Sequence, residues 1–249
     1  MKMGAMEAIS KAWELLKSRP NLLLPWLVAS GFPLLVWSPV VFFASEPGWN
    51  LDEGQLVGLG IVFFLIWSGL WALAAGSTVL AVEAQATGKE RKFREILREA
   101  LARTPSLFLL DLVLLLFIGV TVVLPGLIAY LLFHSVIPLL ILSWIGIGIV
   151  WGAIVLVRTS MAGTALLVDR MGIVKAISAA WNMAKGRFWS LLGLFILLVL
   201  AMSSLLGIIP YLGWIFELAV DTVSNCLYVA AVAFIYVSAG EATFAYERP

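Results

Sequence analysis

Long apolar runs separated by short polar segments dominate this chain of 249 residues. A transmembrane helix needs about 20 apolar residues to cross roughly 30 Å of hydrocarbon. Strongly polar residues bracket six runs that are long enough, and the pattern therefore predicts an all-α, polytopic membrane protein with six transmembrane helices. The bracketed ranges are 22–45, 56–82, 112–133, 135–157, 188–216 and 222–240.

The basic residues predict the direction of these spans, because Lys and Arg stay on the cytoplasmic side of a membrane. Of the sixteen, four precede the first span, six lie between the second and third, five between the fourth and fifth, and one follows the sixth. The opposite loops carry Glu46, Asp52, Glu53 and Glu217 instead. We therefore expect both termini to be cytoplasmic in a multi-pass protein of the cell (plasma) membrane. The first twenty residues are too polar for a signal peptide, so the first span is expected to be retained.

Composition narrows the possible functions. Apolar residues make up 62% of the chain and charged residues 12%, whereas a soluble domain averages roughly 25% charged residues. The single cysteine, Cys226, and the single histidine, His134, offer neither a disulfide nor a cluster of metal ligands. Nucleophile triads and phosphate-binding glycine loops are also missing. We expect no enzyme activity, catalytic residue, cofactor or metal site, and no binding of nucleic acid.

The sequence repeats itself. Residues 8–19 return as 176–187, an offset of 168, with seven of twelve positions identical. A weaker match relates 14–24 to 99–109, at an offset of 85. The chain is therefore predicted to be a single membrane domain, 1–249, made of three tandem units. These units cover about 6–90, 91–172 and 173–249.

Each unit is predicted to open with a short amphipathic helix, called an elbow helix below, followed by a helical hairpin. In the first elbow helix, Ile9, Ala12, Trp13 and Leu16 form an apolar stripe with the i, i+3, i+4, i+7 spacing of one helix face. Basic flanks and Trp are typical of helices that lie in the headgroup layer. Such a helix anchors its hairpin, or it offers a surface for lipids or a partner protein.

The third elbow helix lies in a segment that resembles a known family. Asp169 and Gly172 stand at the end of one span. A helix with the pattern A-x-x-x-A-W follows, in which the last position of the pattern is Trp181, and Lys185-Gly186 then leads into the next span. This pattern resembles the multi-span membrane domain found with some glycerophosphodiester phosphodiesterases, and related uncharacterised six-span families of bacteria and archaea. The resemblance implies a six-span fold. It implies no phosphodiesterase activity, because the chain ends at Pro249 with no soluble catalytic domain.

Several ionisable residues are candidates for a functional role. Glu83, Asp111, Arg158 and Glu241 all fall at cytoplasmic ends of spans. Asp111 and Arg158 lie on neighbouring spans and are the best candidates for an ion pair that orients helices. No ionisable residue is forced to the centre of the bilayer, which argues against an ion-coupled transporter.

Polar residues also mark one face of the sixth span. Asp221, Asn225 and Tyr228 are spaced i, i+4, i+7 and share one face. This stripe either forms hydrogen bonds between helices or opens into a cavity.

Small residues and prolines predict features of packing. Ala72 with Gly76, and Gly148 with Gly152, are small-x-x-x-small pairs that permit close helix contact. We favour packing within the chain over dimerisation. Three prolines are expected to kink or break the first span.

Two functional hypotheses remain in front. The first is a non-enzymatic structural or accessory membrane protein: a scaffold, an assembly partner, or an organiser of lipids and the envelope. The alternative is a transporter or channel with a path between the repeats. A third, an intramembrane enzyme acting on lipids, is the least favoured. The expected partners are membrane lipids, with a possible protein partner at the elbow helices, and the oligomeric state stays open.

Overall fold

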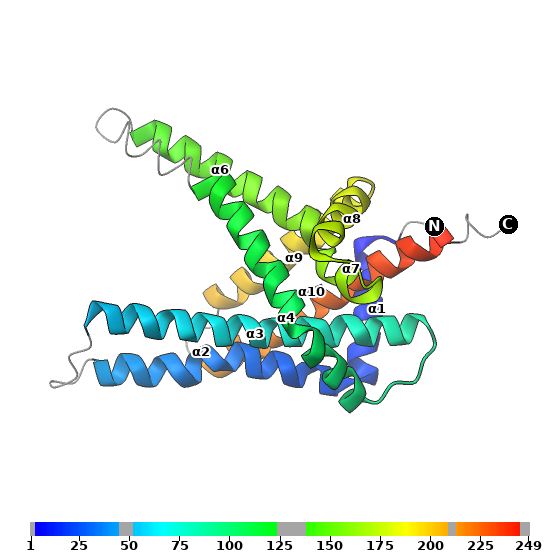
Figure 1. Cartoon of the computed structure of the whole chain (residues 1–249), viewed down its shortest axis with the longest axis horizontal. Helices are drawn as coiled ribbons and strands as arrows, with labels where there is room; N and C mark the ends of the chain where they lie inside the picture. Colours follow the sequence, from blue (N-terminus) through cyan, green and yellow to red (C-terminus); the bar gives the residue numbers. More distant parts are fainter. Residues whose placement is uncertain (1–2, 45–51, 124–137, 209–212, 245–249) are drawn as a thin grey trace.

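The computed structural model describes residues 3–44, 52–123, 138–208 and 213–244, and over these ranges the chain forms helices and no strand (Figure 1). The first predicted unit contains α1 (Ala5–Ser18), η1 (Pro20–Leu22), α2 (Leu23–Ala44) and α3 (Glu53–Ala86). The second contains α4 (Phe93–Ile118), a short π-helix η2 (Gly119–Val123), α6 (Pro138–Thr159) and α7 (Ala162–Val168). The third contains α8 (Ile173–Lys185), α9 (Phe188–Ile208) and α10 (Gly213–Phe244).

Four segments of the described chain are long and apolar enough to cross a membrane. They are Gly54–Ala86, Phe93–Thr121, Val150–Val168 and Glu217–Ala239. These segments overlap the second, third, fourth and sixth predicted spans. The predicted all-helical class, with several helices of membrane-spanning length, is therefore confirmed.

Local sequence sets both ends of α3. The Asp52 carboxylate accepts a hydrogen bond from the backbone N–H of Gln55 at 2.7 Å, and the Gln55 side chain accepts one from the N–H of Asp52 at 3.2 Å. This reciprocal capping box satisfies two free N–H groups at the helix start. Just beyond the other end, Gly88 adopts φ +65°, a left-handed conformation that glycine takes without strain. The resulting helix of 34 residues is about 51 Å long, so it extends beyond the hydrocarbon layer.

The second unit departs from the predicted pattern. The first and third units have an elbow helix, α1 or α8, that ends before the next helix starts. In the second unit the two are joined as α4, which runs through Pro105. The prolines of the first predicted span do not break it either, because α2 is one continuous α-helix. Proline thus fails here as a helix terminator.

Packing is concentrated at one end of the molecule, called the elbow end below, where α1, α8 and the start of α4 lie (Figure 1). The core there is rich in alanine, which lets helix backbones approach closely. Its fully buried alanines include Ala8, Ala74, Ala81, Ala84, Ala100, Ala162, Ala165, Ala176, Ala180, Ala184, Ala231 and Ala233. Away from this end, the α2–α3 hairpin diverges from α4 and α6.

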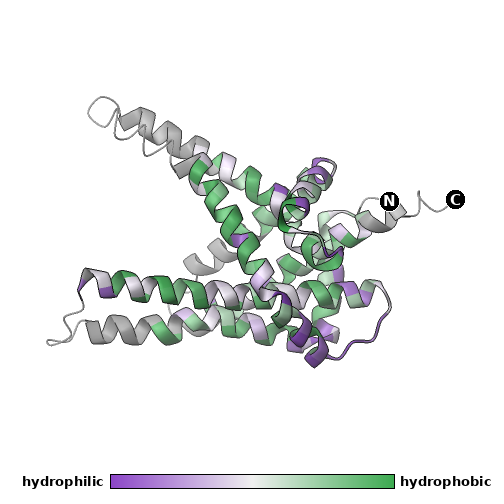
Figure 2. Cartoon of the chain, in the orientation of Figure 1, coloured by the Kyte–Doolittle hydropathy of each residue, from purple (hydrophilic) through white to green (hydrophobic). Residues whose placement is uncertain are grey.

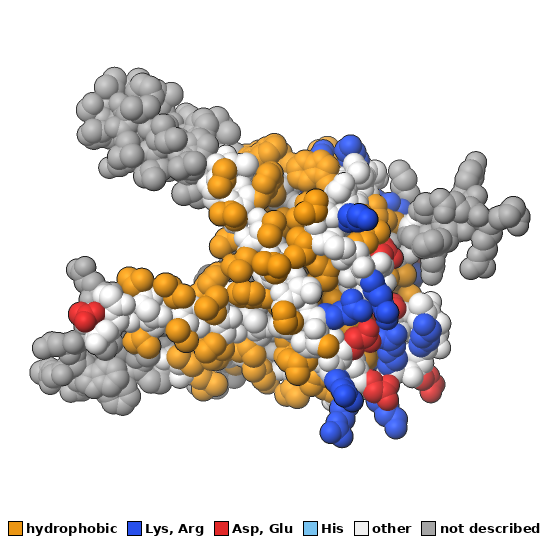
Figure 3. All heavy atoms as spheres, in the orientation of Figure 1, with side chains coloured by type: hydrophobic (Ala, Val, Ile, Leu, Met, Phe, Trp, Pro, Cys, Tyr) orange, Lys and Arg blue, Asp and Glu red, His pale blue; other side chains and the backbone are white. Residues whose placement is uncertain are grey.

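Charge and hydropathy follow the same axis. Purple, hydrophilic positions gather at the elbow end, and green, hydrophobic positions cover the long helices (Figure 2). On the face shown in Figure 3, Lys and Arg cluster with a few acids at the elbow end, and apolar side chains cover most of the rest. The apolar side chains exposed along α3 include Leu56, Val57, Ile61, Val62, Leu65 and Ile66. Such a surface would be unstable in water but suits lipid.

Candidate functional site

The elbow helices α1 and α8 bury the same positions of the sequence repeat. Ala8 and Ala12 of α1 are buried, and so are Ala176 and Ala180 of α8, each 168 residues later. A stripe of side chains this small brings each elbow helix close to its neighbours. The burial pattern therefore follows the pattern of sequence identity.

A second face of each elbow helix is apolar but exposed. Met6 of α1 is 72% exposed, and its equivalent in α8, Val174, is 80% exposed. Trp13 is 44% exposed on the same side of α1, and Leu101 is exposed on the elbow part of α4. Charged residues occupy the remaining face, as in the surface ion pair between Lys11 and Glu7 at 3.5 Å. Each elbow helix thus has a packed face, an exposed apolar face and a charged face.

The elbow helices pack in a cyclic order. α4 packs on α3, and α8 packs on α6 and α7, so each contacts the last helices of the preceding hairpin. α1 packs on α10, the last helix of the third hairpin. The first elbow helix therefore closes the arrangement onto the end of the chain.

The predicted Ala72–Gly76 pair lies within this packing. A Cβ atom added to Gly76 would lie 2.9 Å from Leu107 Cδ1 and 3.6 Å from the Cβ of Ala100. Helices α3 and α4 therefore approach closely at Gly76, and the predicted packing within the chain is confirmed there. Gly152 of the other pair has no atom within 4 Å of the equivalent point, so it makes no such contact.

Glu83 belongs to a charge network where the first unit meets the second. The Arg91 guanidinium lies 3.0 Å from Glu99 and 3.8 Å from Glu83, and Arg103 lies 3.9 Å from Glu99. Arg19 donates to the backbone carbonyl of Arg91 at 3.3 Å. All three pairs are partly exposed, so each contributes little alone. Together they hold the loop after α3 against the elbow part of α4.

Arg158 has a different environment. Its guanidinium lies over the Trp181 ring, 4.8 Å from the centroid, and 6.0 Å from the centroid of Phe188. The predicted ion pair with Asp111 is wrong: Asp111 is exposed on α4, and none of the ion pairs among the described residues contains either side chain. In the part of the chain before η2, helix α4 packs on α3 and α7 and not along α6. Asp111 on α4 and Arg158 on α6 therefore lie apart. The Glu241 side chain lies outside the described residues.

The polar stripe on α10 consists of Asp221, Asn225 and Tyr228. Its arrangement differs from both predictions, which were hydrogen bonds between helices and the opening of a cavity. Asn225 is buried, and its amide donates to the backbone oxygen and to the carboxylate of Asp221, at 2.8 and 2.7 Å. This bond lies within one helix rather than between helices. Tyr228 interacts with Ser160 at the α6–α7 break, so it links two units. The stripe therefore splits into an internal pair and one interhelical contact.

A polar cluster that the sequence does not reveal joins α2, α3 and α10. The buried indole N–H of Trp26 donates to the Thr78 hydroxyl at 2.9 Å, and this hydroxyl lies 3.9 Å from the Cys226 sulfur. Trp71 packs edge-on against Trp26, with centroids 5.0 Å apart. Residues this far apart in sequence carry no spacing signal that would have grouped them.

Further from the elbow end, the same three helices contain polar atoms that lack partners. Four polar side-chain atoms there are buried and make no hydrogen bond among the described residues. Thr222, which carries one of them, is only 3% exposed. Ser30 lies one turn beyond Trp26 on α2, and Thr222 one turn before Cys226 on the antiparallel α10. The four atoms are Ser30 Oγ, Trp67 Nε1, Trp71 Nε1 and Thr222 Oγ1. Unsatisfied groups of this kind mark a place where a polar molecule would gain hydrogen bonds.

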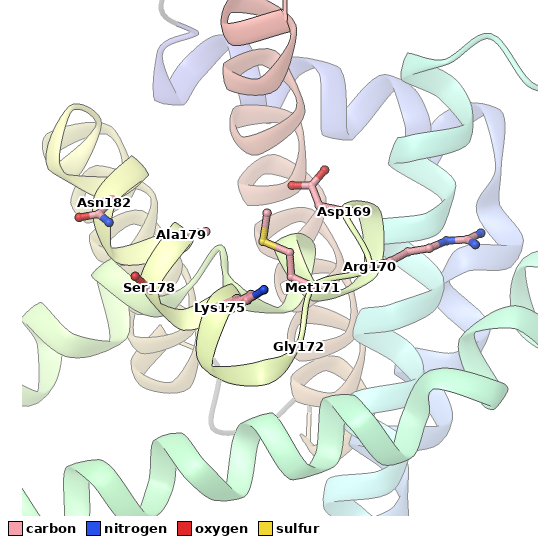
Figure 4. Close-up of a pocket in the computed structure, with 8 residues that line it drawn as sticks. All are labelled: Asp169, Arg170, Met171, Gly172, Lys175, Ser178, Ala179 and Asn182. Carbon is pink, nitrogen blue, oxygen red and sulfur yellow. The ribbon is translucent and has the colours of Figure 1, made fainter.

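A shallow pocket of about 590 Å³ lies at the turn between α7 and α8 (Figure 4). Lys175, Ser178 and Asn182 line it from α8, and Arg170 lines it from the preceding turn. Arg170 has φ 53°, and Asp169 accepts a hydrogen bond from Tyr236 of α10. These features fix the turn at which the family-like segment enters its elbow helix.

Comparisons with protein-family models, curated proteins and solved structures find no match to this chain. The described residues also contain no group of three or more His, Cys, Asp or Glu side chains that could hold a metal ion.

Proposed function

We propose that this chain is a non-enzymatic, six-span protein of the cell membrane with both termini in the cytoplasm. Its role is structural or accessory: it organises lipids, or a partner membrane protein, at the cytoplasmic surface. In this proposal the three units form one domain, and each unit consists of an elbow helix and a hairpin.

The three-faced elbow helices carry this proposal. A helix at the level of the lipid headgroups needs a packed face toward the protein, an apolar face toward acyl chains and a charged face toward water. α1 and α8 have these three faces, with Met6 and Val174 as the most exposed apolar residues.

The cyclic packing supports the threefold organisation. Each elbow helix rests on the preceding hairpin, and the buried alanines of α1 and α8 recur at the offset of the sequence repeat. The clustering of Lys and Arg at the elbow end supports a cytoplasmic position for that end (Figure 3).

Spin labels test the position of the elbow helices. The only native cysteine, Cys226, is first replaced by alanine, and single cysteines are placed at Met6, Val174 or Lys11. In lipid nanodiscs, labels at the first two positions should be relaxed by oxygen more than by a soluble nickel chelate. The label at Lys11, on the charged face of α1, should show the opposite preference.

Two results would overturn the proposal. One is nickel access at Met6 and Val174 as high as at Lys11, which would place both apolar faces in water. The other is reaction of a cysteine near either terminus with an impermeant thiol reagent added outside intact cells. The Lys11 label is the matched control, because it lies on the same helix.

The buried polar atoms between α2, α3 and α10 favour a second candidate, a transporter or channel. Thr222 and Ser30 would face a hydrated path in that case. Cysteines at Thr222 and Asn225, in the Cys226→Ala background, should then react with a soluble thiol reagent. Complete protection of both positions, with no solute flux into proteoliposomes, would reject this candidate.

A further inference from the structure

The junction of α6, α8 and α9 holds two arginines that pair with no acid among the described residues. Arg158 lies in the last turn of α6, and Arg187 lies directly between α8 and α9. The Nε atom of each is buried and makes no hydrogen bond. All ion pairs among the described residues involve other side chains.

Arg158 and Arg187 are half-buried, and the lost hydration of their buried Nε atoms is a cost that no hydrogen bond among the described residues offsets. The C-terminal end of α6 offsets part of this cost for Arg158, but Arg187 also lies at the positive N-terminal end of α9, which opposes the favourable end of α8. The rings of Trp181 and Phe188 hold the Arg158 guanidinium in place without neutralising it. The described residues therefore supply no anion to this junction.

Where the first unit meets the second, an arginine is neutralised by acids of the chain itself. Arg19, the repeat equivalent of Arg187, donates to the backbone carbonyl of Arg91 and forms no ion pair with a described acid. There, Glu83 and Glu99 neutralise Arg91. At the junction of α6, α8 and α9, no acid among the described residues pairs with Arg158 or Arg187, which leaves a place for an anion from outside the chain.

We propose that Arg158 and Arg187 bind the phosphate of an anionic phospholipid at the junction of α6, α8 and α9. Guanidinium groups bind phosphate oxygens through charge-assisted hydrogen bonds. Basic pockets between transmembrane helices on the cytoplasmic side are suited to such headgroups. This inference rests on the proposed function, because it needs the elbow end at the cytoplasmic surface.

The surroundings favour a lipid over a soluble phosphate. Trp189, two residues after Arg187, is 80% exposed, and Trp is typical of the headgroup level. The helices that leave the junction expose large apolar side chains, Val150 and Leu156 on α6 and Ile196 on α9. A phospholipid can place its phosphate at the arginines and its acyl chains along these helices, whereas inorganic phosphate would leave the apolar surface bare.

Lipid retention tests the site. The full chain is purified from nanodiscs containing equal amounts of phosphatidylglycerol and phosphatidylcholine, and bound lipids are counted by native mass spectrometry. The wild type should retain phosphatidylglycerol selectively. The double variant Arg158→Gln/Arg187→Gln should retain at least about tenfold less phosphatidylglycerol, because two charge-assisted phosphate contacts are lost. Arg158→Lys should give an intermediate loss, because lysine keeps the charge but not the planar fork.

Two matched controls remove a positive charge elsewhere. Arg103→Gln and Lys11→Gln delete arginine and lysine side chains that already pair with acids, so both should retain phosphatidylglycerol like the wild type. Elution volume and unfolding midpoint in pure phosphatidylcholine show whether the double variant folds. If it does not, Arg158→Lys and the single Arg187→Gln variant decide.

Three outcomes would overturn the inference. Equal retention by the double variant and the wild type would remove the site. Equal losses in the control variants would mean that lipid retention depends on the total positive charge and not on this site. Displacement of the lipid by millimolar inorganic phosphate would assign the site to a soluble anion. Any of these, with the spin labels still at headgroup depth, would leave the proposed function standing.

Discussion

Replacing Gly76 by alanine puts a methyl group into the contact between α3 and α4. The new Cβ atom would lie 2.9 Å from Leu107 Cδ1 and 3.6 Å from the Cβ of Ala100. Overpacking of this kind costs about 1–3 kcal/mol, and the gain in helix propensity over glycine is about 0.5–1 kcal/mol. The Leu107 tip is flexible, so we expect a net loss of about 1 kcal/mol in the free energy of unfolding.

Gly69 on the same helix is the matched control, because no atom lies within 4 Å of its added Cβ. Gly69→Ala should therefore be neutral or more stable by about 0.5–1 kcal/mol. Equilibrium unfolding in mixed SDS micelles, followed by tryptophan fluorescence, measures both variants. Gly76→Leu should fail to fold, while Gly69→Leu should be tolerated.

A double-mutant cycle isolates the contact itself. Leu107→Ala alone should cost about 2–5 kcal/mol, because Leu107 is buried. In the Gly76→Ala background the same change should cost at least about 1 kcal/mol less, because the clash is removed with the side chain. Additive costs, together with equal behaviour of Gly76→Ala and Gly69→Ala, would refute the close approach of α3 and α4.

Two other predictions concern polar contacts. Trp26→Phe keeps a six-membered ring but removes the N–H donor to Thr78 and part of the buried indole, and it should lower the unfolding free energy by at least about 1 kcal/mol in the same SDS assay; an unchanged midpoint would mean that this bond stabilises nothing. Arg91→Gln leaves Glu83 and Glu99 without their shared partner and should cost about 0.2–1 kcal/mol per pair. Its effect should shrink between 50 and 500 mM salt, and a salt-independent loss would contradict an ionic origin.

Periodicity and residue size predicted part of this structure well. The elbow helices α1 and α8 follow from apolar residues at helical spacing, because a helix with one packed side repeats its buried positions every three to four residues. The contact at Gly76 follows from the absence of side-chain bulk, which lets helices approach. Both signals are local, so a single sequence carries them.

The junctions could not be predicted in the same way. Asp111 and Arg158 were paired because their charges are opposite and their spans adjacent, yet Arg158 packs on Trp181 instead. The Trp26–Thr78 bond spans 52 residues. Which side chains meet at such distances depends on helix rotation and crossing, and spacing along the chain fixes neither. The continuous α4 shows a related limit. Pro105 removes one backbone hydrogen bond and crowds one carbonyl group, and these local effects do not end the helix.

The contact between α1 and α10 ties the first elbow helix to the last helix of the chain. Synthesis proceeds from the N-terminus, so α1 emerges well before its partner has been translated. Until then α1 lacks its main packing partner. The elbow end is therefore completed only by the final hairpin, and a nascent or truncated chain differs from a finished one at its N-terminus.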